Sequence, residues 1–254
     1  MTINELLKKE YEYLSKTYEV YGVFLYGSQN YGLSTDESDF DTKAIVIPSF
    51  EDLMMRKPVS KIIDFGSGEC DVKDIREMIK NYKKQNVNFV ETLFTVYSYV
   101  NPKYEKFHDE LLHRRGDIAR MDERRALECM NGLLGQAKKR MTNVTDKTRA
   151  EIEEFGYHRK SLLNVLKMSF MVDKYIQGQH YMDVLDCSNL RKFRDNVIEK
   201  EAAFKTAEKY DARTYNAVKK YLEKNNPQPN TEVSEWLDKW VMRVVSKNIK
   251  PFKG

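Results

Sequence analysis

The sequence is poor in the residues that build disulfides and zinc sites. Its 254 residues include only three cysteines, Cys70, Cys129 and Cys187, which are far apart and form no C-x-x-C pair. The four histidines show no ligand spacing around them. We therefore expect neither a disulfide framework nor a zinc site, and free buried thiols in a reducing compartment are the default.

Long apolar stretches are missing as well. No run approaches the ~20 apolar residues that cross a bilayer, and residues 1–19 are charged throughout, unlike a signal peptide. The hydrophobic fraction of 41% is still ample for a buried core in a chain of this length. The sequence predicts a soluble, cytoplasmic protein without membrane contact.

Charge is unevenly divided along the chain. Residues 1–100 contain 12 Lys/Arg and 16 Asp/Glu, a net charge of −4, whereas residues 101–254 contain 31 and 23, a net charge of +8. A basic second half is compatible with a polyanionic partner such as RNA. Amphipathic helices with Lys-rich outer faces give the same count, and charge alone favours this second explanation.

Short helical and strand-like segments alternate in the first part of the chain. Thr2 and Glu5 form a capping-box pattern before a helix over 3–17. Periodicity does not decide between helix and strand for 88–100. Further expected elements are a strand over 20–26, a strand over 39–47, a hairpin of 61–65 and 70–75 around Gly66-Ser67-Gly68, and a basic helix over 73–84.

From about residue 104 onward the strand-like runs disappear. Long segments with helical period replace them, at 104–114, 121–141, 159–177, 198–224 and 231–248, with a loop over 225–230. The sequence therefore predicts an α+β protein: a small mixed-sheet domain over 1–102, followed by a mainly helical domain over 103–254.

The most informative stretch is residues 25–47, LYGSQNYGLSTDESDFDTKAIVI. A strand ends in Gly27-Ser28, where glycine lets the backbone approach a ligand closely and Ser28 adds a hydroxyl donor. The next residues can open a short helix, whose free N–H groups favour a phosphate. This pattern indicates a phosphate-binding segment.

Two aspartates follow on the next strand. Asp39 and Asp41 are two residues apart, so on a strand they point to the same face with Cα atoms roughly 6–7 Å apart. Such a pair can hold two divalent cations ~4 Å apart. D-x-D also occurs in solvated turns and calcium loops, but this stretch lacks the glycine and terminal glutamate of an EF-hand loop. The order strand, G-S, turn, S-D-x-D, apolar strand is much more specific than either motif alone.

Residues 21–47 resemble the signature of the DNA polymerase beta-like nucleotidyltransferase superfamily, which is G-S, a short spacer and D-x-D on the next strand. The resemblance is closer to a subgroup of stand-alone predicted nucleotidyltransferases, some of them linked to RNA repair. Their signature is similar to YGS-x-x-YG and then SD-x-D with a basic residue after it. Here the two parts read Tyr26 to Gly32 and Ser38 to Lys43.

The superfamily has a third carboxylate on a neighbouring strand, between apolar residues. Asp71, between Cys70 and Val72, matches this position. Asp74 is the rival, and Glu69 is a weaker one that could assist, because it shares a face with Asp71 on a strand. The next segment also resembles the subgroup, whose N-x-N and E-x-L-F motifs are matched by Asn86, Asn88, Glu91 and Phe94.

The resemblance is fainter in the helical half. The subgroup carries G-Y, two residues, K and an arginine on the following helix, and these places hold Gly156, Tyr157, Lys160 and Lys167, while Arg194 fits a further basic position. Lys160 and Lys167 share a helix face because they are seven residues apart. The sequence departs from the subgroup at Ser161 and Asn164, where histidines are expected. Lysine at 167 also loses the bidentate phosphate geometry of arginine. Without the resemblance, these cations would be read as solvated helix charges.

The resemblance implies a metal-dependent enzyme that moves a nucleoside monophosphate from a nucleoside triphosphate to an acceptor hydroxyl and releases pyrophosphate. Asp39, Asp41 and Asp71 would be the catalytic residues and would hold two Mg²⁺ or Mn²⁺ ions. A cleft between the two domains is the expected location. The expected nucleotide-binding residues are Gly27, Ser28, Tyr31, Ser38, Lys43, Lys160, Lys167 and Arg194.

Three interpretations of the acceptor stay open. The subgroup and the basic second half favour an RNA end, as in RNA repair, with Tyr97, Tyr157 and Tyr181 as aromatics that could stack bases. The second is nucleotidylation of a small molecule or a protein. The third is a catalytically silent nucleotide-binding module, against which the presence of all three aspartates counts. The transferred base and the oligomeric state are not determined by the sequence.

Overall fold

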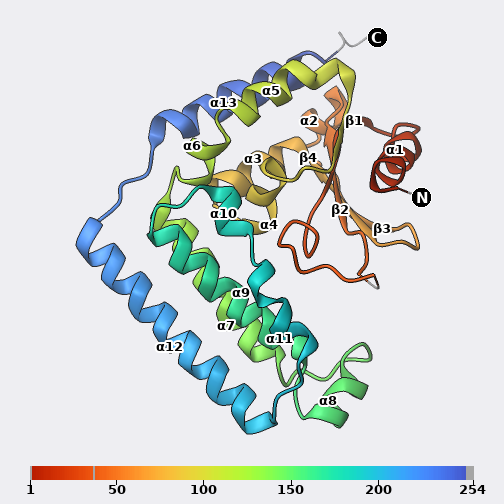
Figure 1. The fold of residues 1–254 in the computed structure, drawn as a ribbon. Coiled ribbons are helices and arrows are strands. Elements are labelled where there is room, and N and C mark those ends of the chain that lie inside the picture. The colour runs from red at the N-terminus through yellow and green to blue at the C-terminus, as the bar shows by residue number, and fades with distance from the viewer. Residues whose placement is uncertain (1, 37, 250–254) are drawn as a thin grey trace. The chain divides into compact units, whose positions relative to one another are not determined.

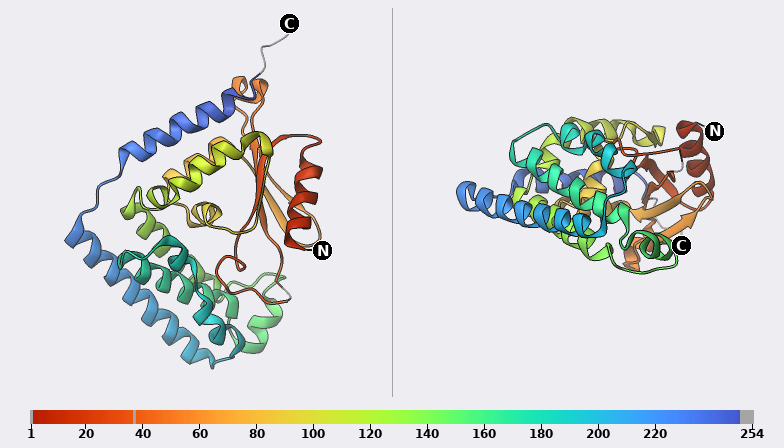
Figure 2. Two further views of the ribbon diagram at one scale, coloured as in Figure 1. Left: turned by 45° about the horizontal axis from the view of Figure 1, so that its top comes forward. Right: turned by 60° about the horizontal axis from the view of Figure 1, so that its bottom comes forward.

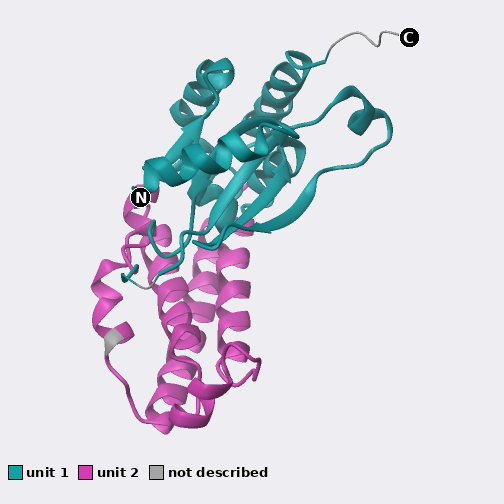
Figure 3. Cartoon of the chain, turned by 90° about the vertical axis from the view of Figure 1, so that its right-hand side faces the viewer, with its two compact units in different colours: residues 1–30, 34–122, 229–254 teal, residues 31–33, 123–228 magenta. Residues whose placement is uncertain are grey.

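Figure 1 shows a computed structural model of the chain, which describes residues 2–36 and 38–249. A five-stranded mixed sheet and many helices make it an α+β protein, which confirms the predicted fold class. The chain forms two compact units (Figure 3): unit 1 is Met1–Asn30, Ser34–Asp122 and Pro229–Gly254, and unit 2 is Tyr31–Leu33 and Glu123–Gln228. Within the described ranges, no helix combines the length and apolarity that a membrane span needs.

The sheet of unit 1 has the strand order β3-β4-β2-β1-β5. β2 and β4 run parallel, and the other neighbours are antiparallel. β3 and β4 form the predicted hairpin, whereas β2 begins three residues later than predicted, so Asp39 and Asp41 lie in the segment that enters it. The strands are β1 (Glu19–Leu25), β2 (Thr42–Ile47), β3 (Ser60–Asp64), β4 (Glu69–Asp74) and β5 (Ser98–Val100).

Helix α1 (Ile3–Leu14) covers one face of this sheet (Figures 1 and 2). It begins with the predicted capping box, in which Thr2 Oγ1 accepts from the Glu5 N–H and Glu5 Oε2 accepts from the Thr2 N–H. Its apolar side meets alternate strand residues, so the core on this face consists of Leu7, Leu14, Val20, Val23, Ala44, Val46, Cys70 and Val72. The intervening strand residues point to the opposite face.

Further helices complete unit 1. α3 contacts β2 and β4 and buries Ile75, Met78, Ile79 and Tyr82. Residues 88–100, which periodicity left undecided, contain both helix and strand: α4, a 3-10 turn and β5. The helices are α2 (Phe50–Met54), α3 (Ile75–Lys83), α4 (Val87–Val90), α5 (Glu105–His113), α6 (Arg115–Ala119) and α13 (Thr231–Ser246), with 3-10 turns at Glu91–Leu93 and Pro102–Tyr104.

The last helix of the chain belongs to the sheet-containing unit. Trp240 of α13 is buried, with its ring centroid 5.9 Å from that of Tyr21, and its Nε1 donates to the Phe107 carbonyl at 3.0 Å. An ion pair of 2.6 Å between Lys83 and Asp238 joins α13 to α3. The compact units divide after Asp122, and aromatic packing holds α5 and α13 in unit 1.

Three long helices pack against one another in unit 2: α7 (Glu123–Arg140), α9 (Arg159–Ile176) and α12 (Lys200–Asn225). Their contacts bury an apolar stripe on each helix, for example Leu127 and Leu134 on α7 and Val165 and Val172 on α9. The shorter elements are α8 (Arg149–Phe155), α10 (Tyr181–Leu185), α11 (Arg191–Asp195) and a 3-10 turn at Ser188–Leu190. The long helices agree with the predicted segments.

Candidate functional site

Strands β2 and β4 align acidic residues on the sheet face opposite α1. Their register places Lys43 beside Asp71. Because alternate residues of a strand share a face, Glu69 lies on this same face at the start of β4, and Asp41 immediately precedes β2. The Glu69 N–H donates to Asp41 Oδ1 at 3.4 Å. Asp41, Glu69 and Asp71 thus lie near the start of the parallel strand pair.

The Gly27-Ser28 turn starts beside Asp41. The Tyr26 N–H donates to the Asp41 carbonyl at 3.1 Å, so the turn that follows Tyr26 begins next to the D-x-D segment. The buried carboxylate of Glu91 holds the turn: its Oε2 accepts from the Gly27 N–H at 3.1 Å and from Asn30 Nδ2 at 3.2 Å. Glu91 is therefore a positioning residue for the candidate phosphate-binding segment.

The expectation of a short helix after Ser28 is wrong. Residues 27–32 form turns, with the Asn30 N–H donating to the Gly27 carbonyl at 3.0 Å. Gly27 and Gly32 have φ angles of +86° and +66°, which a right-handed helix excludes. A phosphate at this turn would meet separate N–H donors and the Ser28 hydroxyl, without the aligned peptide dipoles of a helix.

The D-x-D segment is tied to the β3–β4 turn. The Phe40 N–H, between the two aspartates, donates to the Ser67 carbonyl at 2.9 Å. Just upstream, Ser38 Oγ accepts from the Thr35 N–H at 2.9 Å, so the hydroxyl predicted to bind nucleotide closes a local turn. Asp39 is exposed and Asp41 is half-buried, and neither forms an ion pair with a lysine or arginine in the described part of the chain.

Lys43 lies beneath Asp71 and is shielded from solvent. Its Nζ is 2.9 Å from Asp71 Oδ2 and 4.0 Å from the centroid of the Tyr26 ring, and the Phe89 ring lies 4.7 Å away. With its side chain only 4% exposed, Lys43 holds Asp71 in place. These contacts suit Lys43 to position Asp71, and a direct contact between Lys43 and a nucleotide stays a prediction.

The second oxygen of Asp71 also faces an ammonium group. Lys73 Nζ lies 3.1 Å from Asp71 Oδ1, in a geometry that leaves this buried oxygen without a hydrogen bond. Carboxylate oxygens suit Mg²⁺ or Mn²⁺, and an orphaned buried oxygen is a site for a further ligand. Asp39 and Asp41 offer carboxylate oxygens that no lysine or arginine of the described residues engages, whereas Asp71 would have to exchange Lys73 for a cation. Across residues 2–36 and 38–249, no three Asp, Glu, His or Cys side chains are grouped so that they could hold a metal ion.

Both carboxylate oxygens of Asp74, the alternative third carboxylate, accept hydrogen bonds within the protein. Its side chain is completely buried, and Oδ1 caps α3 by accepting from the Arg76 N–H at 2.8 Å. Arg76 also binds both carboxylate oxygens, at 2.9 and 2.6 Å. Both oxygens of Asp74 are satisfied at the far end of β4, so Asp71 is the better candidate for the site.

The pKa of the Tyr26 phenol is sensitive to the negative charge of the carboxylates around it. Burial is the main cause of a pKa well above the usual tyrosine range. The charges of four nearby carboxylates raise the pKa further: Asp41, Asp71, Glu91 and Glu69. The acidic groups that the sheet aligns are thus close enough to act on one phenol, and this excess of negative charge favours a bound cation.

The predicted residues of unit 2 are engaged mainly with the segment 31–33. The Tyr31 ring is buried and lies 3.9 Å below Lys167 Nζ, and Arg194 donates to the Leu33 carbonyl. Lys160 is exposed on the same helix as Lys167. Tyr31 is therefore a buried residue of unit 2, and Lys167 and Arg194 contact the segment 31–33.

Other motif residues have structural roles. Asn86 Oδ1 accepts from the Asn88 N–H at 3.1 Å and caps α4. Gly156 ends α8 with φ of +76°, and the buried Tyr157 donates its hydroxyl proton to the Ile198 carbonyl at 3.2 Å. These contacts explain the motif positions by capping and packing without a ligand.

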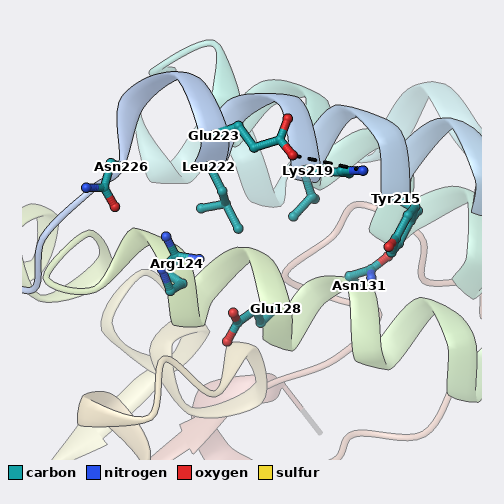
Figure 4. Close-up of a pocket in the computed structure, with 9 residues that line it drawn as sticks. Arg124, Glu128, Asn131, Tyr215, Lys219, Leu222, Glu223 and Asn226 are labelled. Atoms are coloured by element: carbon teal, nitrogen blue, oxygen red, sulfur yellow. Dashed lines mark ion pairs between the residues drawn. The ribbon is translucent and has the colours of Figure 1, made fainter.

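A groove of about 560 Å³ in unit 2 contains none of the predicted residues. It lies between α7 and α12 (Figure 4) and is lined by Arg124, Glu128, Asn131, Tyr215, Val218, Lys219, Leu222, Glu223 and Asn226. Its two cations are matched by two carboxylates, and Lys219 pairs with Glu223 at 3.9 Å. Such a balanced lining does not supply the net positive charge that a triphosphate needs.

Lys73 and Phe89 are site neighbours that the sequence did not indicate, and Tyr26 was indicated only as part of the motif at 26–32. Lys73 stands two residues after Asp71, so strand alternation already placed both on one face. The sandwich of Lys43 between Tyr26 and Phe89 had no such signal, because the two rings come from segments far apart in the chain. Comparison of the sequence with protein-family models gave no match, and comparison with curated proteins gave no significant match.

Proposed function

We propose that the protein is a metal-dependent nucleotidyltransferase that moves a nucleoside monophosphate from a nucleoside triphosphate to an acceptor hydroxyl and releases pyrophosphate. One observation carries the proposal. Asp41 and Asp71 lie near the start of the parallel strand pair beside the Gly27-Ser28 turn, and the exposed Asp39 precedes them on the strand entry. Acidic groups beside a turn that offers a serine hydroxyl and backbone N–H groups suit phosphoryl transfer, which depends on positioning and on neutralisation of phosphate charge.

Each of these residues has a role that follows from its contacts. Asp39 and Asp41 offer carboxylate oxygens that no described cation neutralises. The Gly27-Ser28 turn offers the Ser28 hydroxyl and backbone N–H groups to phosphate oxygens, and Glu91 fixes the turn from below. Mg²⁺ or Mn²⁺ held by the carboxylates would neutralise triphosphate charge and lower the pKa of the acceptor hydroxyl.

An RNA end is the acceptor that we propose first. The net charge of +8 over residues 101–254 supports it, because a cationic surface attracts a polyanion. A second candidate, a catalytically silent nucleotide-binding module, is favoured by the ion pairs that engage Asp71. A small-molecule or protein acceptor is the third alternative.

The test is transfer of label from each α-labelled nucleoside triphosphate, with Mg²⁺ or Mn²⁺, into a pool of small RNAs. Asp39→Ala and Asp41→Ala are expected to abolish transfer while the unfolding midpoint stays within a few degrees, because exposed and half-buried carboxylates contribute little to stability. Asp36→Ala is the matched control, since Asp36 is an exposed aspartate of the same loop. It is expected to keep full activity.

The outcomes separate the candidates. Label in RNA with the wild type and Asp36→Ala alone supports the enzyme with an RNA acceptor. Triphosphate binding without RNA labelling favours a small-molecule or protein acceptor, or the silent module if no acceptor is labelled. Loss of triphosphate binding in the wild type, or unfolding of both aspartate variants, would refute the proposed site.

A further inference from the structure

Donors from residues 187–194 hold the segment 31–33 along its backbone. The three bonds run from the Cys187 N–H to the Tyr31 carbonyl at 3.0 Å, from Arg191 Nε to the Gly32 carbonyl at 2.7 Å, and from Arg194 to the Leu33 carbonyl. Both stretches belong to unit 2. Because three consecutive carbonyl groups are bonded, none of these residues can shift without losing a hydrogen bond.

Side-chain packing holds the same segment. Tyr31 and Leu33 are 1% and 4% exposed. Between them, Gly32 has φ of +66°, and a Cβ added to it would lie 3.1 Å from the Ser188 Cβ. Glycine therefore serves here both through its left-handed conformation and through its lack of a side chain, which lets the segment lie close to residues 187–194.

The chain passes directly from this segment to the turn that contains Gly27 and Ser28. The first stretch of unit 1 ends at Asn30, and the unit 2 segment begins at Tyr31. Asn30 is itself anchored, because its Nδ2 donates to the Leu25 carbonyl at 3.1 Å and its N–H donates to the Gly27 carbonyl at 3.0 Å. One peptide bond spans at most about 3.8 Å between Cα atoms, so the turn has no slack to absorb a movement of the segment.

Arg191 is the donor whose contribution can be tested by itself. It is exposed on α11, and its Nε bond to the Gly32 carbonyl ties it to the segment. Within the described ranges it has no carboxylate partner, so replacing it disrupts no ion pair. Cys187 donates through its main chain, which a substitution does not remove, and Arg194 is half-buried.

We infer that Arg191 is a positioning residue for the Gly27-Ser28 turn, on which it acts through Gly32. Together with the other two donors it fixes the segment 31–33, and this segment determines where the turn presents the Ser28 hydroxyl and its backbone N–H groups. The importance of that position for a bound phosphate rests on the proposed function. The coupling between residues 187–194 and the turn depends only on the contacts described above.

The test is hydrogen exchange of the full-length protein without ligand, measured by mass spectrometry. Arg191→Met keeps an aliphatic side chain and removes the donor to Gly32. The Gly27 and Asn30 N–H groups report on the turn, because both are hydrogen-bonded in it. Their exchange is expected to become about tenfold faster, the size of effect that follows loss of a hydrogen bond from a charged group. The thermal unfolding midpoint is expected to stay within a few degrees.

Lys192→Met is the matched control. Lys192 is the exposed neighbour of Arg191 on α11, and its ammonium group lies 5.4 Å from the Phe193 ring centroid. Its replacement removes the same charge but is expected to leave exchange in residues 27–33 unchanged. Gly32→Ala is a second variant that disturbs the segment from its own side. It is expected to accelerate exchange at the same amides, and it decides the question if Arg191→Met does not fold.

Three results would separate the possibilities. Faster exchange at Cys187 in Arg191→Met with residues 27–30 unchanged would show that the contact is only local, and would overturn the inference. Equal acceleration in Lys192→Met would reduce the effect to net charge and overturn it as well. A separate titration with a nucleoside triphosphate tests the proposed function: absence of binding by the wild type would refute that function, whereas the exchange experiment decides the coupling without any ligand.

Discussion

The methyl group added by Gly68→Ala would clash with the backbone of the segment that contains Asp39 and Asp41. A Cβ at this position would lie 2.4 Å from the Phe40 carbonyl oxygen and 2.6 Å from its carbon. Carbon and oxygen atoms normally approach to about 3.3 Å, so Phe40 must move by roughly 1 Å. The flexible end of a side chain could yield cheaply, but these are backbone atoms between the two aspartates.

The expected cost has two parts. Overpacking a tight site costs about 1–3 kcal/mol, and loss of the hydrogen bond from Phe40 to Ser67 adds about 0.5–1.5 kcal/mol. We therefore expect the free energy of unfolding to fall by about 1.5–4.5 kcal/mol. A displacement of roughly 1 Å in a catalytic segment reduces transfer by about 100-fold, and Mn²⁺ affinity at Asp39 and Asp41 is expected to weaken with it.

Gly66→Ala supplies a control in the same turn. Gly66 has φ of +77°, and an added Cβ would meet no atom within 4 Å. Alanine there is expected to cost about 1–2 kcal/mol from left-handed backbone strain without pushing Phe40. Urea unfolding gives the stability of both variants, and nucleotide transfer and Mn²⁺ titration give the state of the site.

Two results for Gly68→Ala and Gly66→Ala would contradict this prediction. If Gly68→Ala unfolds at the same urea concentration as the wild type, the close approach to Phe40 is not a constraint and the reasoning is refuted. If both variants lose transfer and Mn²⁺ binding equally, general destabilisation explains the loss, and the turn has no specific hold on the aspartates.

Two buried titratable groups predict opposite dependences of stability on pH. Burial raises the pKa of Glu10 above its usual 4.5, although hydrogen bonds from Thr42 and Cys70 act in the opposite direction. The folded state therefore favours the protonated carboxyl group, and the stability that this group contributes is lost as pH rises from about 4.5 through the raised pKa. Glu10→Gln is expected to be more stable than the wild type at pH 8 and no better at pH 4, and equal gains at both pH values would contradict this. Burial lowers the pKa of His108 from 6.5 to about 4, so stability falls by about 2–3 kcal/mol between pH 7 and pH 4.5. Urea unfolding of His108→Gln is expected to lack this part of the acid dependence, and a parallel curve would refute it.

Local elements followed from the sequence because short-range contacts determine them. The Thr2–Glu5 capping box, the hairpin around Gly66 and the loop over 225–230 all lie where local patterns predicted them. These features depend on backbone sterics and on hydrogen bonds between residues two to four positions apart. The shared face of Glu69 and Asp71 on β4 was predictable for the same reason, since strand alternation has a fixed period.

The helix predicted for residues 27–32 does not form, because two glycines adopt backbone conformations that a right-handed helix excludes. Gly27 and Gly32 take left-handed conformations, and the turn is anchored by Glu91, 64 positions along the chain. A residue that distant leaves no trace in a local pattern. The place of α13 in unit 1 also depends on a distant contact, because Trp240 packs against Tyr21.

The sequence by itself determined the α+β class, the order of the elements and the acids that line one edge of the sheet. Only the tertiary structure decided which charges neutralise which: Asp74 caps α3 with Arg76, Lys43 and Lys73 face Asp71, and Asp39 and Asp41 stay unpaired among the described residues. The physical reason is that the energy of an ion pair depends on distance and burial. Strand register and packing determine both, and sequence spacing does not.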